Sequence, residues 1–154
     1  MIDKLEKYNQ YFVISSEKSY GFLFKFLKKL YADKLIVFLS GNIGVGKTTF
    51  VKYLINFYEK KNKLKLSEVT SPTYNLLNEY HINKFQINHY DLYRVKHTNE
   101  LNELNMFKDN SNIITLIEWP QLVETKPKHL IELNFQYDDD YKKRYVQTKG
   151  LILN

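Results

Sequence analysis

The chain has 154 residues, a net charge of +6 and no cysteine. This length is typical of one ordinary domain, so we expect a single domain over residues 1–154. Apolar residues make up 44% of the chain and aromatic residues 16%, which excludes a disordered or fibrous protein. The lack of cysteine excludes disulfides, thiol nucleophiles and Cys-ligated zinc.

The positive charge comes from 21 Lys and only two Arg, which are Arg94 and Arg144. Arg is the residue that makes bidentate contacts to phosphate and guanine, so this balance favours a solvated Lys-rich surface over a nucleic-acid groove. No apolar run reaches the roughly 18 residues of a membrane span, and the N-terminus has no signal-peptide run. We therefore expect a cytoplasmic protein that has no membrane partner.

The first third of the chain predicts a helix, a strand, a turn and a second helix. Ser15 or Ser16 is placed to cap a helix that begins near Glu17, where apolar residues recur at three- and four-residue spacing. Residues 35–39, LIVFL, are typical of a strand that is covered on both faces. A glycine-rich turn follows, and helical spacing returns over residues 49–58.

The rest of the chain predicts further strands with one short helix between them. Residues 74–80 and 85–90 indicate a hairpin, and Thr98 is placed to cap a short helix. Residues 113–118, IITLIE, predict a strongly apolar strand that ends before a proline. Three late strands, divided by an acidic turn and by Gly150, are expected beside a parallel core: 130–135, 144–148 and 151–153.

The sharpest motif is GNIGVGKT at residues 41–48, which matches G-x-x-x-x-G-K-[ST] between a predicted strand and a predicted helix. Glycines let backbone N–H groups curl around a polyphosphate, while Lys47 supplies a cation and Thr48 a hydroxyl for Mg²⁺. The motif predicts an α/β fold of the P-loop NTPase type, with three layers and a mostly parallel sheet with added antiparallel strands. The predicted binding residues for a nucleoside triphosphate are Gly41, Asn42, Gly44, Val45, Gly46, Lys47, Thr48 and Thr49.

Two carboxylates follow predicted strands and are candidates for the same site. Glu118 ends an apolar strand at the sheet edge where ligands bind in α/β folds, so we expect it to hold Mg²⁺ or orient water. Asp91 is a second candidate for the metal or the water. Arg94 is placed either to stabilise γ-phosphate charge or to pair with Asp91, and Thr73 lies either in a γ-phosphate-sensing loop or in a simple turn.

The remaining candidates are an aromatic residue and the histidines. Trp119 follows Glu118 and is either a core residue or an interface aromatic, and we favour the core. The histidines show no metal-ligand spacing, so we expect them to be structural or exposed, although His89 shares a segment with Asp91. The four are His81, His89, His97 and His129.

Four segments, GNIGVGKTTF, SPTYNLLNEY, HYDLYR and ITLIEWPQ, together resemble the bacterial TsaE (YjeE) family in their order and separation. That family is the P-loop ATPase of tRNA threonylcarbamoyladenosine (t6A) biosynthesis, and the match covers residues from about 11 to 120. The resemblance implies ATP and Mg²⁺ as cofactors. It also implies action beside the TsaD–TsaB heterodimer on adenosine 37 of tRNA, with any tRNA contact made through that complex.

The resemblance carries roles onto individual residues. It implies Mg²⁺ at Thr48 and Glu118, and catalytic roles for Lys47, Asp91 and Glu118. Further matches are a switch-like loop at Thr73, an activity-linked position at Trp119 and adenine contacts near residues 15–17. The resemblance also implies phosphate binding at Gly44, Gly46, Lys47, Thr48 and Thr49. Asn42 stands where this family commonly has Asp, and Leu104-Asn105 stands where Leu-Gly is common.

Two other functions fit a P-loop chain. The main alternative is a small P-loop kinase acting on a metabolite or nucleoside. Such kinases hold the transferring phosphate with several arginines, whereas this chain has two. The other is a binding module that grips RNA and uses its nucleotide state as a switch.

Overall fold

The structure is a computed structural model that describes residues 5–14, 17–30, 34–107, 112–128 and 130–153. These residues form seven strands, three α-helices and one 3-10 helix. In chain order the elements are β1 (Leu5–Ile14), α1 (Glu17–Leu30), β2 (Lys34–Ser40), α2 (Lys47–Lys61), β3 (Leu77–Ile82), β4 (Phe85–Asp91), α3 (Thr98–Asn102), β5 (Ile113–Glu118), η1 (Pro120–Leu122), β6 (Leu130–Tyr137) and β7 (Arg144–Leu153).

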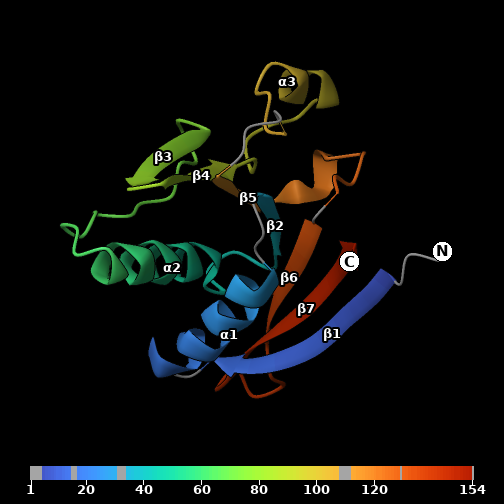
Figure 1. Cartoon of the computed structure of the whole chain (residues 1–154). Helices are drawn as coiled ribbons and strands as arrows, with labels where there is room; N and C mark the ends of the chain where they lie inside the picture. The colour runs from blue at the N-terminus through green and yellow to red at the C-terminus, as the bar shows by residue number, and fades with distance from the viewer. Residues whose placement is uncertain (1–4, 15–16, 31–33, 108–111, 129, 154) are drawn as a thin grey trace.

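The seven strands form one mixed sheet with the order β1-β7-β6-β2-β5-β4-β3 (Figure 1). The four central strands, from β6 to β4, run parallel to one another. The outer strands are antiparallel to their neighbours, with β7 and β1 at one edge and β3 at the other. This arrangement confirms the predicted α/β fold with a parallel core and added antiparallel strands.

Each face of the sheet has its own apolar cluster. In β2, Val37 and Leu39 join the cluster beneath α1 and α2, whereas Ile36 and Phe38 join the opposite cluster. Strand side chains alternate between faces, so burial of both sets shows that β2 is covered on both sides, as its apolar run predicts. The second face is covered by the segments around α3 and η1, which contribute Leu101 among other residues.

Several element boundaries differ from those predicted. Helix α2 extends over Lys47–Lys61, beyond the predicted 49–58 on both sides. Strand β3 begins only at Leu77, because Leu76 adopts a left-handed φ of 66° and closes a turn onto the Pro72 carbonyl at 2.7 Å. The prediction that Thr98 caps α3 is wrong.

His97 is the residue that caps α3. The Glu100 N–H donates to the His97 backbone carbonyl at 3.2 Å, and the Glu100 carboxylate accepts the His97 N–H at 3.0 Å. These reciprocal bonds satisfy two backbone donors at the start of the helix.

The C-terminal strands also differ from the prediction. Strand β6 belongs to the parallel core, because it pairs in parallel with β2. Gly150 does not divide two strands, since β7 runs through it and pairs it with Ile131 and with Tyr8. A Cβ at Gly150 would lie 2.5 Å from Ile131 Cδ1, so the glycine makes room for a neighbouring side chain.

Some predicted features lie outside the residues that the structure describes. The helix cap at Ser15 or Ser16, part of the adenine contact near residues 15–17, and the role of His129 lie outside the described residues. Within the described part, no helix combines the length and apolar character that crossing a membrane requires.

Candidate functional site

The glycine-rich loop between β2 and α2 has a backbone that favours glycine at three positions. Gly41, Gly44 and Gly46 have φ values of 141°, 77° and 108°, which L side chains rarely adopt. A Cβ at Gly41 would also lie 2.6 Å from the Phe135 carbonyl oxygen. Gly46 is the N-cap of α2, so the loop delivers the chain directly into the positive end of that helix.

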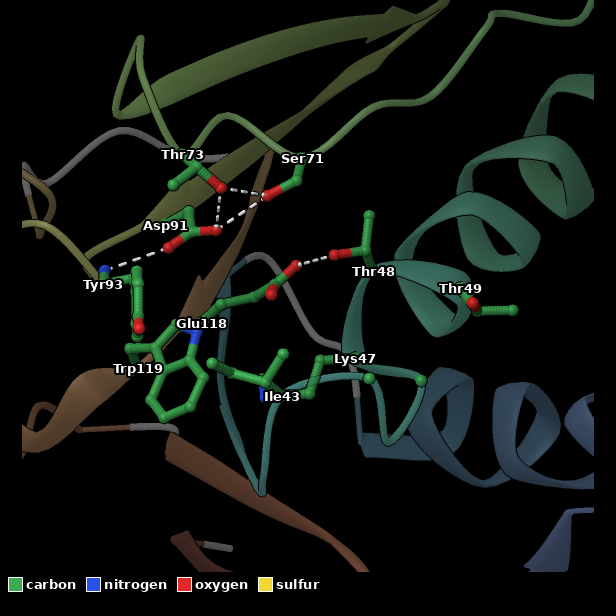
Figure 2. A pocket seen from close by; sticks show the side chains of 12 residues that line it. Ile43, Lys47, Thr48, Thr49, Ser71, Thr73, Asp91, Tyr93, Glu118 and Trp119 are labelled. Carbon is green, nitrogen blue, oxygen red and sulfur yellow. Dashed lines mark hydrogen bonds between the residues drawn. The ribbon is translucent and has the colours of Figure 1, made fainter.

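A cavity of about 330 Å³ opens above this loop. Its walls come from the loop, the start of α2, the segment before β3 and the ends of β4 and β5 (Figure 2). The parallel register places Asp91 beside Glu118, and Glu118 beside Leu39, at the carboxyl edge of the sheet. The lining residues are Ile43, Gly44, Gly46, Lys47, Thr48, Thr49, Ser71, Thr73, Asp91, Tyr93, Glu118 and Trp119.

Glu118 and Thr48 are in direct contact in the cavity wall although they are far apart in sequence. The Thr48 hydroxyl donates to Glu118 Oε1 at 2.8 Å, and only 3% of Glu118 is exposed. A hydroxyl and a carboxylate side by side are the oxygen ligands that Mg²⁺ takes from proteins. The structure thus brings together the two predicted metal ligands.

Asp91 is also buried, and its carboxylate holds the neighbouring loop. Oδ2 accepts from the hydroxyls of Ser71 at 2.7 Å and Thr73 at 2.9 Å, while Oδ1 accepts the Tyr93 N–H at 2.9 Å. Figure 2 shows these three bonds converging on Asp91 at the wall opposite Lys47. The segment at residues 71–73 is therefore tied to the end of β4, next to Glu118.

Arg94 lies outside the lining of the cavity. Its guanidinium carbon is 4.0 Å from the ring centroid of Tyr74, and that tyrosine is 78% exposed. This cation–π contact takes the place of the pairing with Asp91 that the sequence left open. Arg94 and Tyr74 thus form an exposed pair beside the loop that Asp91 holds.

Lys47 is buried at the mouth of the glycine-rich loop. Its ammonium donates to the carbonyls of Gly41 at 2.6 Å and Asn42 at 3.0 Å, and it lies 4.0 Å from the Trp119 ring centroid. Burial lowers the pKa of Lys47, and the nearby carboxylates of Glu118 and Asp91 partly offset this shift.

Trp119 packs against the core and also lines the cavity. The indole packs on the second apolar cluster and also lines the cavity, between Lys47 and Tyr93. Its ring centroid is 5.0 Å from that of Tyr93, and its backbone has a left-handed φ of 58°. The turn after β5 therefore aims a large aromatic ring at the loop lysine.

Three of the predicted phosphate-binding residues do not line this cavity. Gly41, Asn42 and Val45 border a different cavity of about 470 Å³, whose other wall is residues 134–139 and Tyr141. Val45 is 1% exposed and belongs to the core. These three positions lie on the side of the loop that faces the second cavity.

Three residues that the motifs do not single out also contact the site. His89 is fully buried and its Nε2 lies 2.8 Å from Glu118 Oε1. The hydroxyl of Tyr137 donates to the Gly44 carbonyl at 3.1 Å. A Cβ at Gly46 would lie 2.7 Å from Arg144 Nη1, so that guanidinium packs against the loop.

Only one of these three residues could be placed near the site from the sequence. His89 lies two positions before Asp91 on the same strand, so alternation places both side chains on one face. Tyr137 and Arg144 flank the turn between β6 and β7, and their closeness to the loop depends on a strand order that the sequence does not specify.

A parallel sheet with a glycine-rich loop between its central strand and a helix, and a Lys, a hydroxyl and a carboxylate around that loop, defines the P-loop NTPase class. A solved structure described as Bacillus subtilus YdiB has the same fold. It superposes with a TM-score of 0.63 and 19% identity, covering 96% of this chain and 88% of the other.

Sequence comparisons then identify the family. A family model described as "Threonylcarbamoyl adenosine biosynthesis protein TsaE" matches residues 14–146. A TsaE protein of Rickettsia bellii is 40% identical over 109 residues, covering 70% of this chain and 73% of the relative. A TsaE protein of Borreliella burgdorferi is 39% identical over 127 residues, covering 79% and 87%. The chain belongs to the TsaE family, as its four motifs suggested.

Proposed function

We propose that this protein binds ATP with Mg²⁺ at the glycine-rich loop and hydrolyses it as a component of the tRNA t6A modification machinery. The observation that carries the proposal is the contact of Thr48 with Glu118 at 2.8 Å, inside a cavity floored by the loop. A hydroxyl at the start of the helix and an acid at the end of the neighbouring strand are the pair that Mg²⁺-nucleotide chemistry needs.

The loop and Lys47 would bind the phosphates. The left-handed glycines let successive N–H groups turn toward an anion, and the positive end of α2 adds to their attraction. Lys47 lies at the loop mouth, where its ammonium donates to the Gly41 and Asn42 carbonyls, and on nucleotide binding it would donate to β- and γ-phosphate oxygens. The buried ammonium would then remain hydrogen-bonded, because phosphate oxygens would replace the carbonyl oxygens as its acceptors.

Thr48 and Glu118 fit Mg²⁺, because this ion takes one or two protein oxygens and completes its shell with water and phosphate. When bound, Mg²⁺ would neutralise charge on the phosphates during hydrolysis. Glu118 is 3% exposed, so little bulk water screens its charge.

Asp91 would orient the attacking water. It lies beside Glu118 in the parallel register, and its carboxylate holds Ser71 and Thr73 in the cavity wall. A loop with two hydroxyls at this position can respond to the presence of a γ-phosphate, because a new acceptor would compete with Asp91 for them. Thr73 therefore serves as the switch residue of this proposal.

The partner in this proposal is the TsaD–TsaB heterodimer, with tRNA reached through the complex in the cytoplasm. Arg94 lies on the exposed Tyr74 ring, and Trp119 lies with Tyr93 at the cavity rim. Arginine and aromatic side chains are enriched where protein partners bind tightly, so this rim is suited to the heterodimer. P-loop ATPases often depend on groups from a partner, and we expect slow turnover by the isolated protein.

The test is ATP hydrolysis at fixed protein concentration, alone and with the TsaD–TsaB pair of the same organism. We expect the pair to stimulate hydrolysis and Glu118→Ala to bind ATP without hydrolysing it. ADP formation that ignores the pair but requires a small-molecule acceptor would refute the proposal and indicate a metabolite kinase.

A further inference from the structure

His89 is a buried polar side chain of β4, on the face of the sheet that lies beneath α2. It is 0% exposed, and its strand neighbour on the same face, Ile87, belongs to the cluster of apolar residues under the helices. The partner across the parallel register, Leu116, is equally buried. An imidazole at such a position needs a hydrogen-bond partner, because burying an unpaired polar group is costly.

Glu118 provides that partner. His89 Nε2 lies 2.8 Å from Glu118 Oε1, whereas His89 Nδ1 is buried and has no hydrogen-bond partner in the described part of the chain. A hydrogen on Nδ1 would be a buried donor without an acceptor, which costs more than an unused lone pair. The contacts therefore assign the ring hydrogen to Nε2, which donates it to the carboxylate.

The two donors to Glu118 leave one of its oxygens open. Both Thr48 Oγ1 and His89 Nε2 contact Oε1, each at 2.8 Å, and neither contacts Oε2. The bond from His89 comes from the buried interior, and the bond from Thr48 comes from the start of α2. Two bonds from these two sides fix the rotation of the carboxylate.

We propose that His89 is a positioning residue for the metal site, because its Nε2–H holds Glu118 in the orientation that binds Mg²⁺ with the nucleotide. The inference rests on the proposed function and adds to it a residue that touches neither nucleotide nor metal. Hydrogen bonds to a ligating carboxylate keep its orientation, and their loss typically lowers metal affinity by about 10- to 100-fold.

The test compares His89→Leu, which has no donor, with His89→Gln, whose amide can donate near the position of Nε2. His81→Leu is the control, because His81 is an exposed histidine on the neighbouring strand β3. We would measure Mn²⁺ affinity by electron paramagnetic resonance in the presence of ADP, and ADP affinity by calorimetry in EDTA. Thermal melting of each variant checks that it folds.

We expect His89→Leu to bind ADP in EDTA within about twofold of wild type, and to bind Mn²⁺ with ADP about 10- to 100-fold more weakly. His89→Gln should recover most of that loss, and His81→Leu should match wild type. Equal Mn²⁺ affinity in His89→Leu and wild type would overturn the inference alone. Wild-type protein that fails to bind ADP would instead overturn the proposed function, and this inference with it.

A second measurement tests the hydrogen bond in wild-type protein and does not depend on metal binding. Nitrogen-15 chemical shifts of the imidazole in wild-type protein distinguish a hydrogen on Nε2 from one on Nδ1, with His89→Gln identifying the signal. We expect the Nε2–H form. The Nδ1–H form would overturn the proposal, because Nε2 would then have no hydrogen to donate to Glu118.

Discussion

Asp91 gives the prediction that the structure specifies most fully. Its carboxylate accepts three hydrogen bonds, at 2.7, 2.9 and 2.9 Å, and is 2% exposed. Two donors are hydroxyls of Ser71 and Thr73, which water can reach, so we count about 1 kcal/mol for each bond rather than the larger value for charged pairs. Asp91→Ala should therefore lower the free energy of unfolding by about 3 kcal/mol.

The Asn variant at the same position separates geometry from charge. In Asp91→Asn the amide oxygen can still accept the Tyr93 N–H, and the amide NH₂ can donate to the two hydroxyls. We expect a loss of about 1 kcal/mol for this variant. Hydrolysis stimulated by TsaD–TsaB should fall in both variants, because neither retains the carboxylate that the proposal needs.

The assay is thermal unfolding by calorimetry combined with hydrogen exchange over residues 70–76. At about 2–4 °C per kcal/mol for a chain of this size, Asp91→Ala should melt about 6–12 °C below wild type and Asp91→Asn about 2–4 °C below. Exchange over residues 70–76 should accelerate much more in the Ala variant. Equal melting temperatures for the two variants would refute the reasoning that hydrogen bonds to Asp91 hold this loop.

The remaining predictions concern the loop. Burial lowers the pKa of Lys47 from its ordinary 10.5, so wild-type stability rises with pH as the folded state releases this proton before the unfolded state does. The melting temperature of wild type relative to that of Lys47→Met should therefore increase from pH 7 to pH 10. A difference that stays constant over this range would contradict the lowered pKa of Lys47. Gly41→Ala should lose about 1–3 kcal/mol in urea unfolding, because φ is 141° and the Cβ would lie 2.6 Å from a backbone oxygen of β6. Gly21→Ala is its matched control and should be neutral or stabilising, because Gly21 lies within α1 and its Cβ would meet no atom within 4 Å. Tyr137→Phe removes the bond to the Gly44 carbonyl and should weaken ADP binding by about 2- to 10-fold in calorimetry, with an unchanged affinity counting against a role for this bond.

Local patterns in the sequence predicted the parts of the fold that depend on local chemistry. The apolar run of β2, the glycine-rich turn and the helix after it each follow from neighbouring residues, although that helix begins at Lys47 and not at the predicted residue 49. Glu118 could be placed at the sheet edge because it ends an apolar strand before a proline. Such features need no knowledge of which strands are neighbours.

Features that depend on strand order could not be predicted from the sequence. The parallel pairing of β6 with β2 and the passage of β7 through Gly150 are set by long-range contacts. The same contacts bring Tyr137 and Arg144 to the loop. Alternation along β4 predicts that His89 shares a face with Asp91, but its contact with Glu118 depends on the pairing of β4 with β5.

The central claim is that the glycine-rich loop is a nucleotide site in which Lys47 holds the phosphates. Its most direct test is calorimetric titration of ATP with Mg²⁺ into wild type, Lys47→Ala and Lys126→Ala, the last being a surface lysine paired with Glu132. The account predicts saturable ATP binding by wild type and by Lys126→Ala. It predicts affinity weakened by at least about tenfold in Lys47→Ala, because hydrogen bonds to charged groups contribute about 1.5–3 kcal/mol each. ATP binding by Lys47→Ala with wild-type affinity, or no ATP binding by wild type, would contradict it.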